Sequence, residues 1–315
     1  MRSVRTGVTL AGACLLLLGV MPVISNGRPP GASALTFAVM LTVWEVVFAV
    51  PVQVREWRSG ERGLLAQALP RAAVRRVVLV TLGTSVLFGL ATWGYVLAFQ
   101  TAGAVNAAIA LQVYPILAAA AEVVVLGRRK TAAELAATGV IVVALYYLAT
   151  GGTWRMSGLS GWFAVALSVP VMWTVAHVVL RQALLTTAIT PLQVTTSRLL
   201  VSAVFLVPVA LLVDGPAEVA AAVLDPGLEL FAAGMGLAYY TELVLWFYAV
   251  RHIDISLGSA ITVPAPAVTL VLAVAFLGEH AHRYQVVALT VVLAGLLGLL
   301  AAGAAARARE RAPAG

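Results

Sequence analysis

The chain has 315 residues, of which 62% are hydrophobic and only 10% are charged, and its formal net charge at pH 7 is +7. Soluble domains carry roughly 45–50% apolar and about 25% charged residues, so this composition excludes a water-soluble fold and makes the bilayer the solvent. The single cysteine, Cys14, excludes a disulfide framework and any metal site built from several cysteines.

Apolar stretches long enough to cross a bilayer, about 20 residues each, recur along the whole chain. Short turns join neighbouring stretches. The ten predicted spans are Gly7–Ile24, Ala34–Val54, Val74–Phe99, Ala102–Leu126, Ala132–Thr150, Leu159–Leu180, Pro191–Val213, Leu228–Val250, Ile255–Leu277 and Tyr284–Ala302. The first resembles a signal peptide, but we expect it to remain as a span because nine others follow. The mixed residues of 64–74 indicate a surface-lying helix before the third span.

Basic residues divide unevenly between the two sides of the membrane. With the N-terminus in the cytoplasm, sixteen Lys and Arg residues lie on the cytoplasmic side, and three, Arg28, Arg155 and Arg283, lie opposite. Basic residues concentrate in cytoplasmic loops, so both termini are predicted to be cytoplasmic. We expect the cytoplasmic (plasma) membrane, the cell inner membrane, as the location. Topology thus explains the cationic charge, and no nucleic-acid partner is expected.

Two stretches 151 residues apart share one pattern: a proline, an apolar run and a Leu-Gly ending. The first runs from Pro115 to Gly127, and the second from Pro266 to Gly278. Each copy holds five spans, so the second must lie upside down relative to the first, as in inverted-repeat transporters. The predicted domains are 1–152 as the first five-helix repeat, 153–303 as the second, inverted repeat, and 304–315 as a basic cytoplasmic tail.

These motifs resemble those of the drug/metabolite transporter superfamily, specifically its EamA-type two-repeat exporters. Leu277-Gly278-Glu279-His280, followed by Gln285, matches the family pattern, and Arg198 matches an Arg early in the seventh helix. The first copy departs from it, with Arg128 in place of the Glu and Glu134 where Gln285 stands. The resemblance implies ten helices around a central cavity, alternating access, small amphiphilic substrates, and a helix-capping role for Glu279.

Ionisable side chains inside spans indicate function, because a charge at the bilayer centre costs about 2.5–3.5 kcal/mol on insertion scales. Glu45 and Arg198 lie well inside the second and seventh spans, which are repeat equivalents. We expect them to pair across the cavity, or to bind the amine and the carboxylate of a zwitterion. A static pair that holds the two halves together is the alternative.

Aromatic residues accompany two further ionisable groups. Glu242 shares a helical face with Tyr239 and Trp246, which suits cation recognition or proton carriage. An interior carboxyl satisfied by a neighbouring helix is the alternative. His177 shares a face with Trp173 and is a candidate proton relay, or else an interfacial residue at a helix end.

Residues around the two prolines complete the candidate site. Pro115 and Pro266 are predicted hinges, because proline removes a helical hydrogen bond. Asn106 and Gln112 do not share a helical face, so at most one should face substrate. Trp93 and Tyr95 belong to the cavity wall, with aromatic packing or interface anchoring as the alternative. The substrate-binding candidates are Glu45, Trp93, Tyr95, Asn106, Tyr114, Trp173, Arg198, Tyr239, Glu242 and Trp246, and the proton-coupling candidates are Glu45, Glu242 and His177.

The predicted function is therefore a secondary transporter, not an enzyme, that exports amino acids, related metabolites or drugs. Either proton exchange or the substrate gradient alone would drive it. A membrane-embedded transferase and a non-transporting membrane protein of the same fold are the alternatives; the sequence shows no clustered nucleophile or metal motif for the former. We expect no cofactor and no metal. The expected partners are a small-molecule substrate and the lipid bilayer, with a homodimer left open.

Overall fold

The computed structural model describes residues 2–60, 62–63, 70–117, 120–121, 131–155, 161–187, 189–249, 252–253, 258 and 261–311, and their regular structure is helical. The helices are α1 (Arg2–Gly27), α2 (Ala34–Arg58), α3 (Arg71–Ala102), α4 (Ala104–Leu111), α6 (Ala132–Ala149), α7 (Gly161–Thr186), α8 (Pro191–Val213), α9 (Pro216–Val223), α10 (Pro226–Ala249), α12 (Ala265–Phe276) and α13 (Arg283–Arg311).

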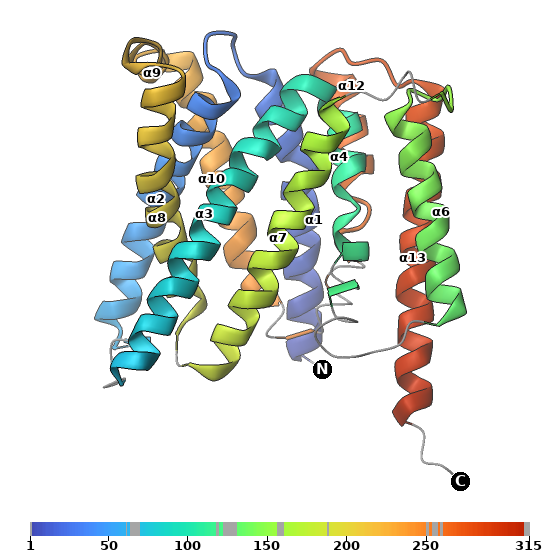
Figure 1. The fold of residues 1–315 in the computed structure, drawn as a ribbon, viewed down its shortest axis with the longest axis horizontal. Coiled ribbons are helices and arrows are strands. Elements are labelled where there is room, and N and C mark those ends of the chain that lie inside the picture. Colours follow the sequence, from blue (N-terminus) through green and yellow to red (C-terminus); the bar gives the residue numbers. More distant parts are fainter. Residues whose placement is uncertain are drawn as a thin grey trace.

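Eight of these described helices are long and apolar enough to cross a bilayer. The predicted all-α membrane class is therefore confirmed. Two shorter apolar helices, α4 and α12, lie where the fourth and ninth spans were predicted. The long helices stand roughly side by side, and both chain termini lie at the same end of the bundle (Figure 1). We call this the terminal end, and the end that carries α9 the opposite end.

The structure differs from the predicted spans in several places. The acidic segment after α8 contains α9, a short helix that the hydropathy pattern did not reveal. Helix α13 continues through Arg311, so the predicted tail from residue 304 begins as a helix. Residues 71–74 of the expected surface helix form the first turn of α3. Residues 64–69 of that helix and the corner at 126–130 lie outside the described residues.

Side-chain caps set where several helices begin. The Thr131 hydroxyl accepts the backbone N–H of Glu134, whose carboxylate in turn accepts the N–H of Thr131, which is a complete capping box for α6. Thr190 and Gln193 form the same box for α8. At the start of α2, the Ser33 hydroxyl accepts the N–H of Thr36. The polar residues that punctuate the apolar sequence therefore satisfy backbone groups at helix starts.

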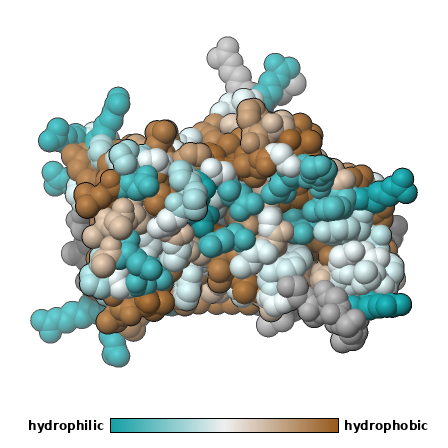
Figure 2. Space-filling view, turned by 90° about the horizontal axis from the view of Figure 1, so that it is seen from above, coloured by the Kyte–Doolittle hydropathy of each residue, from teal (hydrophilic) through white to brown (hydrophobic). Residues whose placement is uncertain are grey.

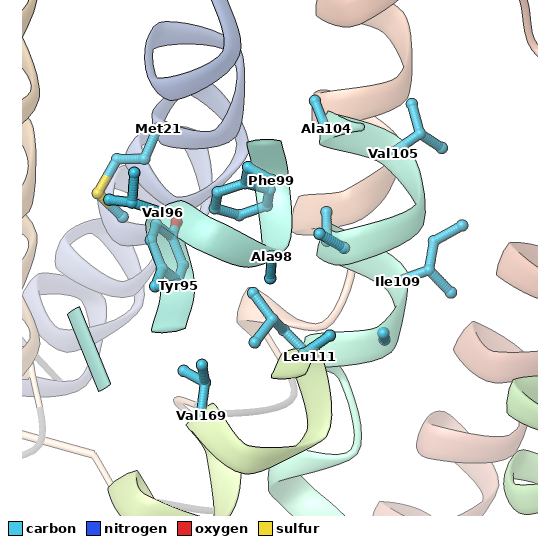
Figure 3. Packing of buried hydrophobic residues seen from close by; sticks show 14 of the residues in the cluster. Met21, Tyr95, Val96, Ala98, Phe99, Ala104, Val105, Ile109, Leu111 and Val169 are labelled. Atoms are coloured by element: carbon cyan, nitrogen blue, oxygen red, sulfur yellow. The ribbon is translucent and has the colours of Figure 1, made fainter. Parts of the chain in front are cut away.

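A single large cluster of buried apolar side chains joins helices from both halves of the chain. Figure 3 shows part of it, where Tyr95 and Phe99 of α3 lie near Met21 of α1 and Leu111 of α4. The outer apolar side chains remain exposed, for example Leu212 and Val204 of α8, as expected for surfaces in lipid. Viewed from above, hydrophilic residues cross the end of the bundle and apolar ones show along parts of its outline (Figure 2).

Two helices are interrupted at corresponding places. Helix α4 ends at Leu111, and the helical course resumes at Tyr114 after a turn at Gln112 and Val113. A turn at Val263 and Pro264 precedes α12 in the same way. The first turn lies just before Pro115 and the second just before Pro266. The two turns are 151 residues apart in the sequence.

Candidate functional site

A cavity of about 160 Å³ lies in the centre of the bundle, among helices from both halves of the chain. Its wall includes residues of α1, α3 and α4 from the first half and of α7, α8, α10 and α12 from the second. Ten of the predicted site residues line it: Tyr95, Tyr114, Pro115, Trp173, His177, Arg198, Tyr239, Glu242, Trp246 and Pro266. Helices distant in sequence therefore bring most of the candidates to one space.

Aromatic rings form much of the cavity wall. The ring centroid of Tyr95 lies 5.8 Å from that of Trp173 and 5.9 Å from that of Tyr239, so α3, α7 and α10 meet through these three side chains. Beyond them, the Tyr114 hydroxyl lies 3.2 Å from Nδ1 of His177, at hydrogen-bonding distance. Aromatic rings offer apolar area and negative faces, so such a wall suits an amphiphilic or cationic ligand.

Among the described residues of the cavity wall, Arg198 is the cation and Glu242 the carboxyl group. The Arg198 guanidinium lies over the Phe88 ring, with Cζ 3.9 Å from the ring centroid, and its buried Nε has no hydrogen-bond partner among the described residues. Glu242 is 8% exposed and faces the same cavity from α10. One wall group of each sign, both nearly dehydrated, gives the cavity a strong internal field.

The predicted face of α10 is present in the structure. Tyr239, Glu242 and Trp246 all line the cavity, as their three- and four-residue spacing predicts. Behind them, the Cys14 thiol of α1 lies 3.6 Å from the backbone carbonyl oxygen of Glu242. The thiol is therefore packed against α10 and has no exposed surface.

Glu45 does not line the cavity, contrary to its predicted place. It is only 1% exposed, and its Oε1 has no hydrogen-bond partner among the described residues. Within the described residues, no ion pair of 4.0 Å or less joins Glu45 to Arg198. The two groups interact electrostatically over a longer distance. The close approach of α10 to α2 explains the burial, because Gly236 packs directly against the backbone of Leu41 and Glu45.

Trp93 and Asn106 also lie away from the cavity. Trp93 packs against apolar side chains of α2 and α8, because it is two residues from Tyr95 and points to another side of α3. The Asn106 side-chain oxygen accepts a hydrogen bond of 2.9 Å from the Gln285 amide, and its amide group donates to the carbonyl of Ala102. Both residues therefore tie helices together in this structure.

The sequence prediction missed several wall residues, notably Phe88, Phe99 and Gln112. The first two could have been found, because Phe88, Tyr95 and Phe99 repeat at seven and four residues and so share one face of α3. Gln112 lines the cavity while Asn106 does not, which agrees with the expectation that at most one of them faces it. No group of three or more potential metal ligands occurs among the residues that the structure describes.

Side-chain hydrogen bonds cross between the two halves at the opposite end of the bundle. Oε1 of Glu279 accepts the backbone N–H of Ala104 at 3.1 Å and the side-chain amide of Asn26 at 3.2 Å. Glu279 thus caps α4, which confirms the role that the resemblance implied. The Trp44 indole donates to Glu229 at 2.6 Å, and the Thr36 hydroxyl donates to Asp214 at 2.7 Å.

Burial affects a further cation near this end. Arg28, in the turn after α1, donates to the carbonyl of Ser25 and to the Gln100 side chain, and lies over the Phe37 ring. Removal from water lowers the pKa of this guanidinium from its ordinary value. Arg28 therefore belongs to the packing of this end and not to the cavity wall.

Comparison with known proteins agrees with this architecture. Residues 160–301 match the model of the EamA-like transporter family. No curated protein is significantly similar to the chain in sequence. Among 23 matching chains of solved structures, one crystal structure superposes with a TM-score of 0.63 at 18% identity, over 94% of this chain and 97% of the other. That likeness concerns the fold alone. The second half of the chain, residues 160–301, is an EamA-like transporter family domain, as expected for a member of the drug/metabolite transporter superfamily.

Proposed function

We propose that the protein is a secondary transporter that exports small amphiphilic metabolites, such as amino acids or related compounds, or drugs, across the cytoplasmic membrane. The observation that carries this proposal is the central cavity, where Arg198 and Glu242 stand in an aromatic wall inside membrane-spanning helices. A binding site at this depth, between two halves of a bundle, is what alternating access requires.

We further propose that the fold consists of ten spans in two inverted five-helix repeats. In this arrangement α4 and α12 belong to the fourth and ninth spans. The helix contacts support it, because they come in equivalent pairs: α1 packs on α10 as α7 packs on α3, and α2 packs on α10 as α8 packs on α3. Helices of equivalent rank, such as α2 with α8 and α6 with α13, also pack on each other.

The shift of 151 residues supports the repeat in greater detail. It relates Ala132, the first residue of α6, to Arg283, the first residue of α13. It also relates two hydrogen bonds that tighten the chain after the helix breaks: Ile116 N–H to the carbonyl of Val113, and Ala267 N–H to the carbonyl of Pro264. Equivalent backbone geometry at equivalent positions favours two copies of one folding unit.

Glu242 is the leading candidate for proton coupling, because it is the carboxyl group that faces the cavity. His177 lines the same cavity beside Tyr114, whereas Glu45 is not among the wall residues. We place both termini in the cytoplasm, on the basis of the distribution of basic residues. The remaining alternatives are a gradient-driven facilitator, a membrane-embedded transferase and a non-transporting membrane protein.

The test uses purified protein in liposomes that contain a pH-sensitive dye, with an imposed pH gradient. Pools of amino acids, nucleosides, cationic drugs and sugar phosphates are added in turn. We expect one pool to collapse the gradient, and Glu242→Gln to prevent this. Glu218→Gln, a change at an exposed residue of α9, is the matched control. If no pool moves protons but radiolabelled substrate exchanges, the protein is a facilitator; if nothing exchanges, the transport proposal is wrong.

A further inference from the structure

The two helix breaks expose backbone carbonyl groups in the same pattern. In an unbroken helix, the carbonyl of Leu111 would accept the N–H of residue 115, but that residue is proline and has none. The carbonyl of Gln112 would accept the N–H of Ile116, which instead donates to Val113 at 3.0 Å. In the second break, Ala267 donates to Pro264 at 2.9 Å and so bypasses the carbonyl of Val263.

Two of these three carbonyl groups belong to buried residues, Leu111 and Val263, and Gln112 is partly exposed. Leu111 is 8% exposed and Val263 is 1% exposed. Among the described residues, no N–H or O–H group donates to the carbonyl oxygens of Leu111, Gln112 or Val263. Buried carbonyl groups in native proteins nearly always have a hydrogen-bond donor, so these carbonyl groups are suited to accept a hydrogen bond from a ligand.

Both breaks adjoin the central cavity. Leu111, Gln112 and Pro115 line it at the first break, and Ala265 and Pro266 line it at the second. Glu242 lines the same cavity and is the only carboxylate among its described wall residues. The cavity therefore combines a negative charge with uncommitted hydrogen-bond acceptors, and an occupant that supplies both a positive charge and several N–H donors would satisfy them together.

Given the proposed function, on which this step rests, we propose that the carbonyl groups exposed at the two breaks, with Glu242, bind the N–H donors of a protonated amine. The substrates are then primary or secondary ammonium compounds. A primary ammonium group brings three donors, whereas a quaternary ammonium group brings charge alone. The aromatic wall would accept either group, but only the first satisfies the carbonyl oxygens.

A pair of isomeric ligands separates N–H donation from charge and size. The α,α-dimethyl derivative of 2-phenylethylammonium carries three N–H donors, and its N,N-dimethyl isomer carries one, at equal charge and composition. Binding to the purified protein is measured by the fluorescence of its tryptophans, two of which, Trp173 and Trp246, line the cavity. We expect the isomer with three donors to bind at least tenfold more tightly. Equal affinity, or a reversed order, overturns the inference.

Proline variants test whether the breaks are responsible. Pro115→Ala restores an N–H that can close the bond to Leu111, and Pro266→Ala restores an N–H at the corresponding position of the second break. We expect the double variant to reduce the preference between the isomers to less than threefold. Pro208→Ala is the matched control, because this proline lies inside α8 and outside the cavity wall, and should leave the preference unchanged.

The outcomes of this test and of the liposome test can be distinguished. If neither isomer binds, the amine class is wrong, while flux of a pool without amines would still support transport. If the affinities of the isomers differ tenfold and the double proline variant preserves this difference, other groups accept the N–H donors of the ligand. The proposed role of the helix breaks is then wrong. The ligand pair alone decides the question should the double variant fail to fold.

Discussion

Glu134 and Gln285 perform the same task at the start of two helices that lie side by side. Oε2 of Glu134 accepts the backbone N–H of Thr131 at 2.8 Å, and Oε1 of Gln285 accepts the backbone N–H of His282 at 2.9 Å. Each residue stands third in its helix, and the two are 151 residues apart. A carboxylate and an amide are therefore interchangeable as acceptors here, which is why the two copies could diverge at this position.

Gln285 has a second role, since its amide also donates to Asn106 of α4 at 2.9 Å. Gln285→Ala should therefore lose both the cap and the link between α13 and α4, and destabilise the protein by about 1–3 kcal/mol. Gln285→Glu keeps the acceptor and should lose less. The measurement is the melting temperature in detergent, with the exposed Thr290→Ala of the same helix as control. Equal melting temperatures for all three variants would show that the cap is not needed.

Gly236 sets the distance between α10 and α2. A β-carbon at this position would lie 2.8 Å from both the carbonyl oxygen of Leu41 and Cβ of Trp44, so Gly236→Ala must push the helices apart. We expect a loss of about 1–3 kcal/mol, read from the same thermal unfolding experiment. The control is Gly12→Ala in α1, where a β-carbon meets nothing within 4 Å. An unchanged melting temperature for Gly236→Ala would contradict the close contact.

Glu242 and Glu45 should differ in access from the cavity. In a Cys14→Ala background, Glu242→Cys should react with a small thiol reagent at least tenfold faster than Glu45→Cys. The reason is that Glu242 belongs to the cavity wall, whereas Glu45 is buried beneath α10. Labelling rates followed by mass spectrometry check this. Comparable rates would mean that Glu45 also reaches the cavity.

The two ends of the bundle should face different compartments. In the same cysteine-free background, Arg62→Cys should be labelled only from the cytoplasm, and Glu218→Cys of α9 only from outside intact cells. These residues lie at the terminal end and at the opposite end of the bundle. An impermeant reagent applied to whole cells and to inverted vesicles separates the cases. Labelling of Arg62→Cys in intact cells would reverse the proposed topology.

Hydropathy was sufficient to locate the membrane helices, because a bilayer requires long apolar segments. It could not locate α9 (Pro216–Val223), which is short and lies in an acidic connection. Nor could it show that α4 stops at Leu111, because the residues around the break are as apolar as the helix itself. The proline at 115 indicated a perturbation, but the turn lies at Gln112 and Val113, because the N–H of Ile116 bonds the carbonyl of Val113 and bypasses that of Gln112.

Helical spacing defines a face for Tyr239, Glu242 and Trp246, and all three residues line the cavity. Spacing gives no such guide where a helix is apolar on every side. Trp93 and Tyr95 are close in sequence but point in different directions, and nothing in the pattern of α3 says which one faces the cavity. The burial of Glu45 could not be predicted for another reason: it depends on the absence of a side chain at Gly236, in a helix nearly 200 residues further along the chain.

The hydrogen bonds that join the two halves at the opposite end also determine how often the molecule can change state. Asn26, Thr36, Trp44 and Asn106 of the first half each bond a residue of the second, namely Glu279, Asp214, Glu229 and Gln285. If each contributes about 0.5–1.5 kcal/mol, the four together favour this conformation by roughly 2–6 kcal/mol before any compensation at the other end. Without such compensation, the alternative conformation would be occupied at most a few per cent of the time. The turnover rate would then depend on how much more tightly a substrate binds the alternative conformation than this one.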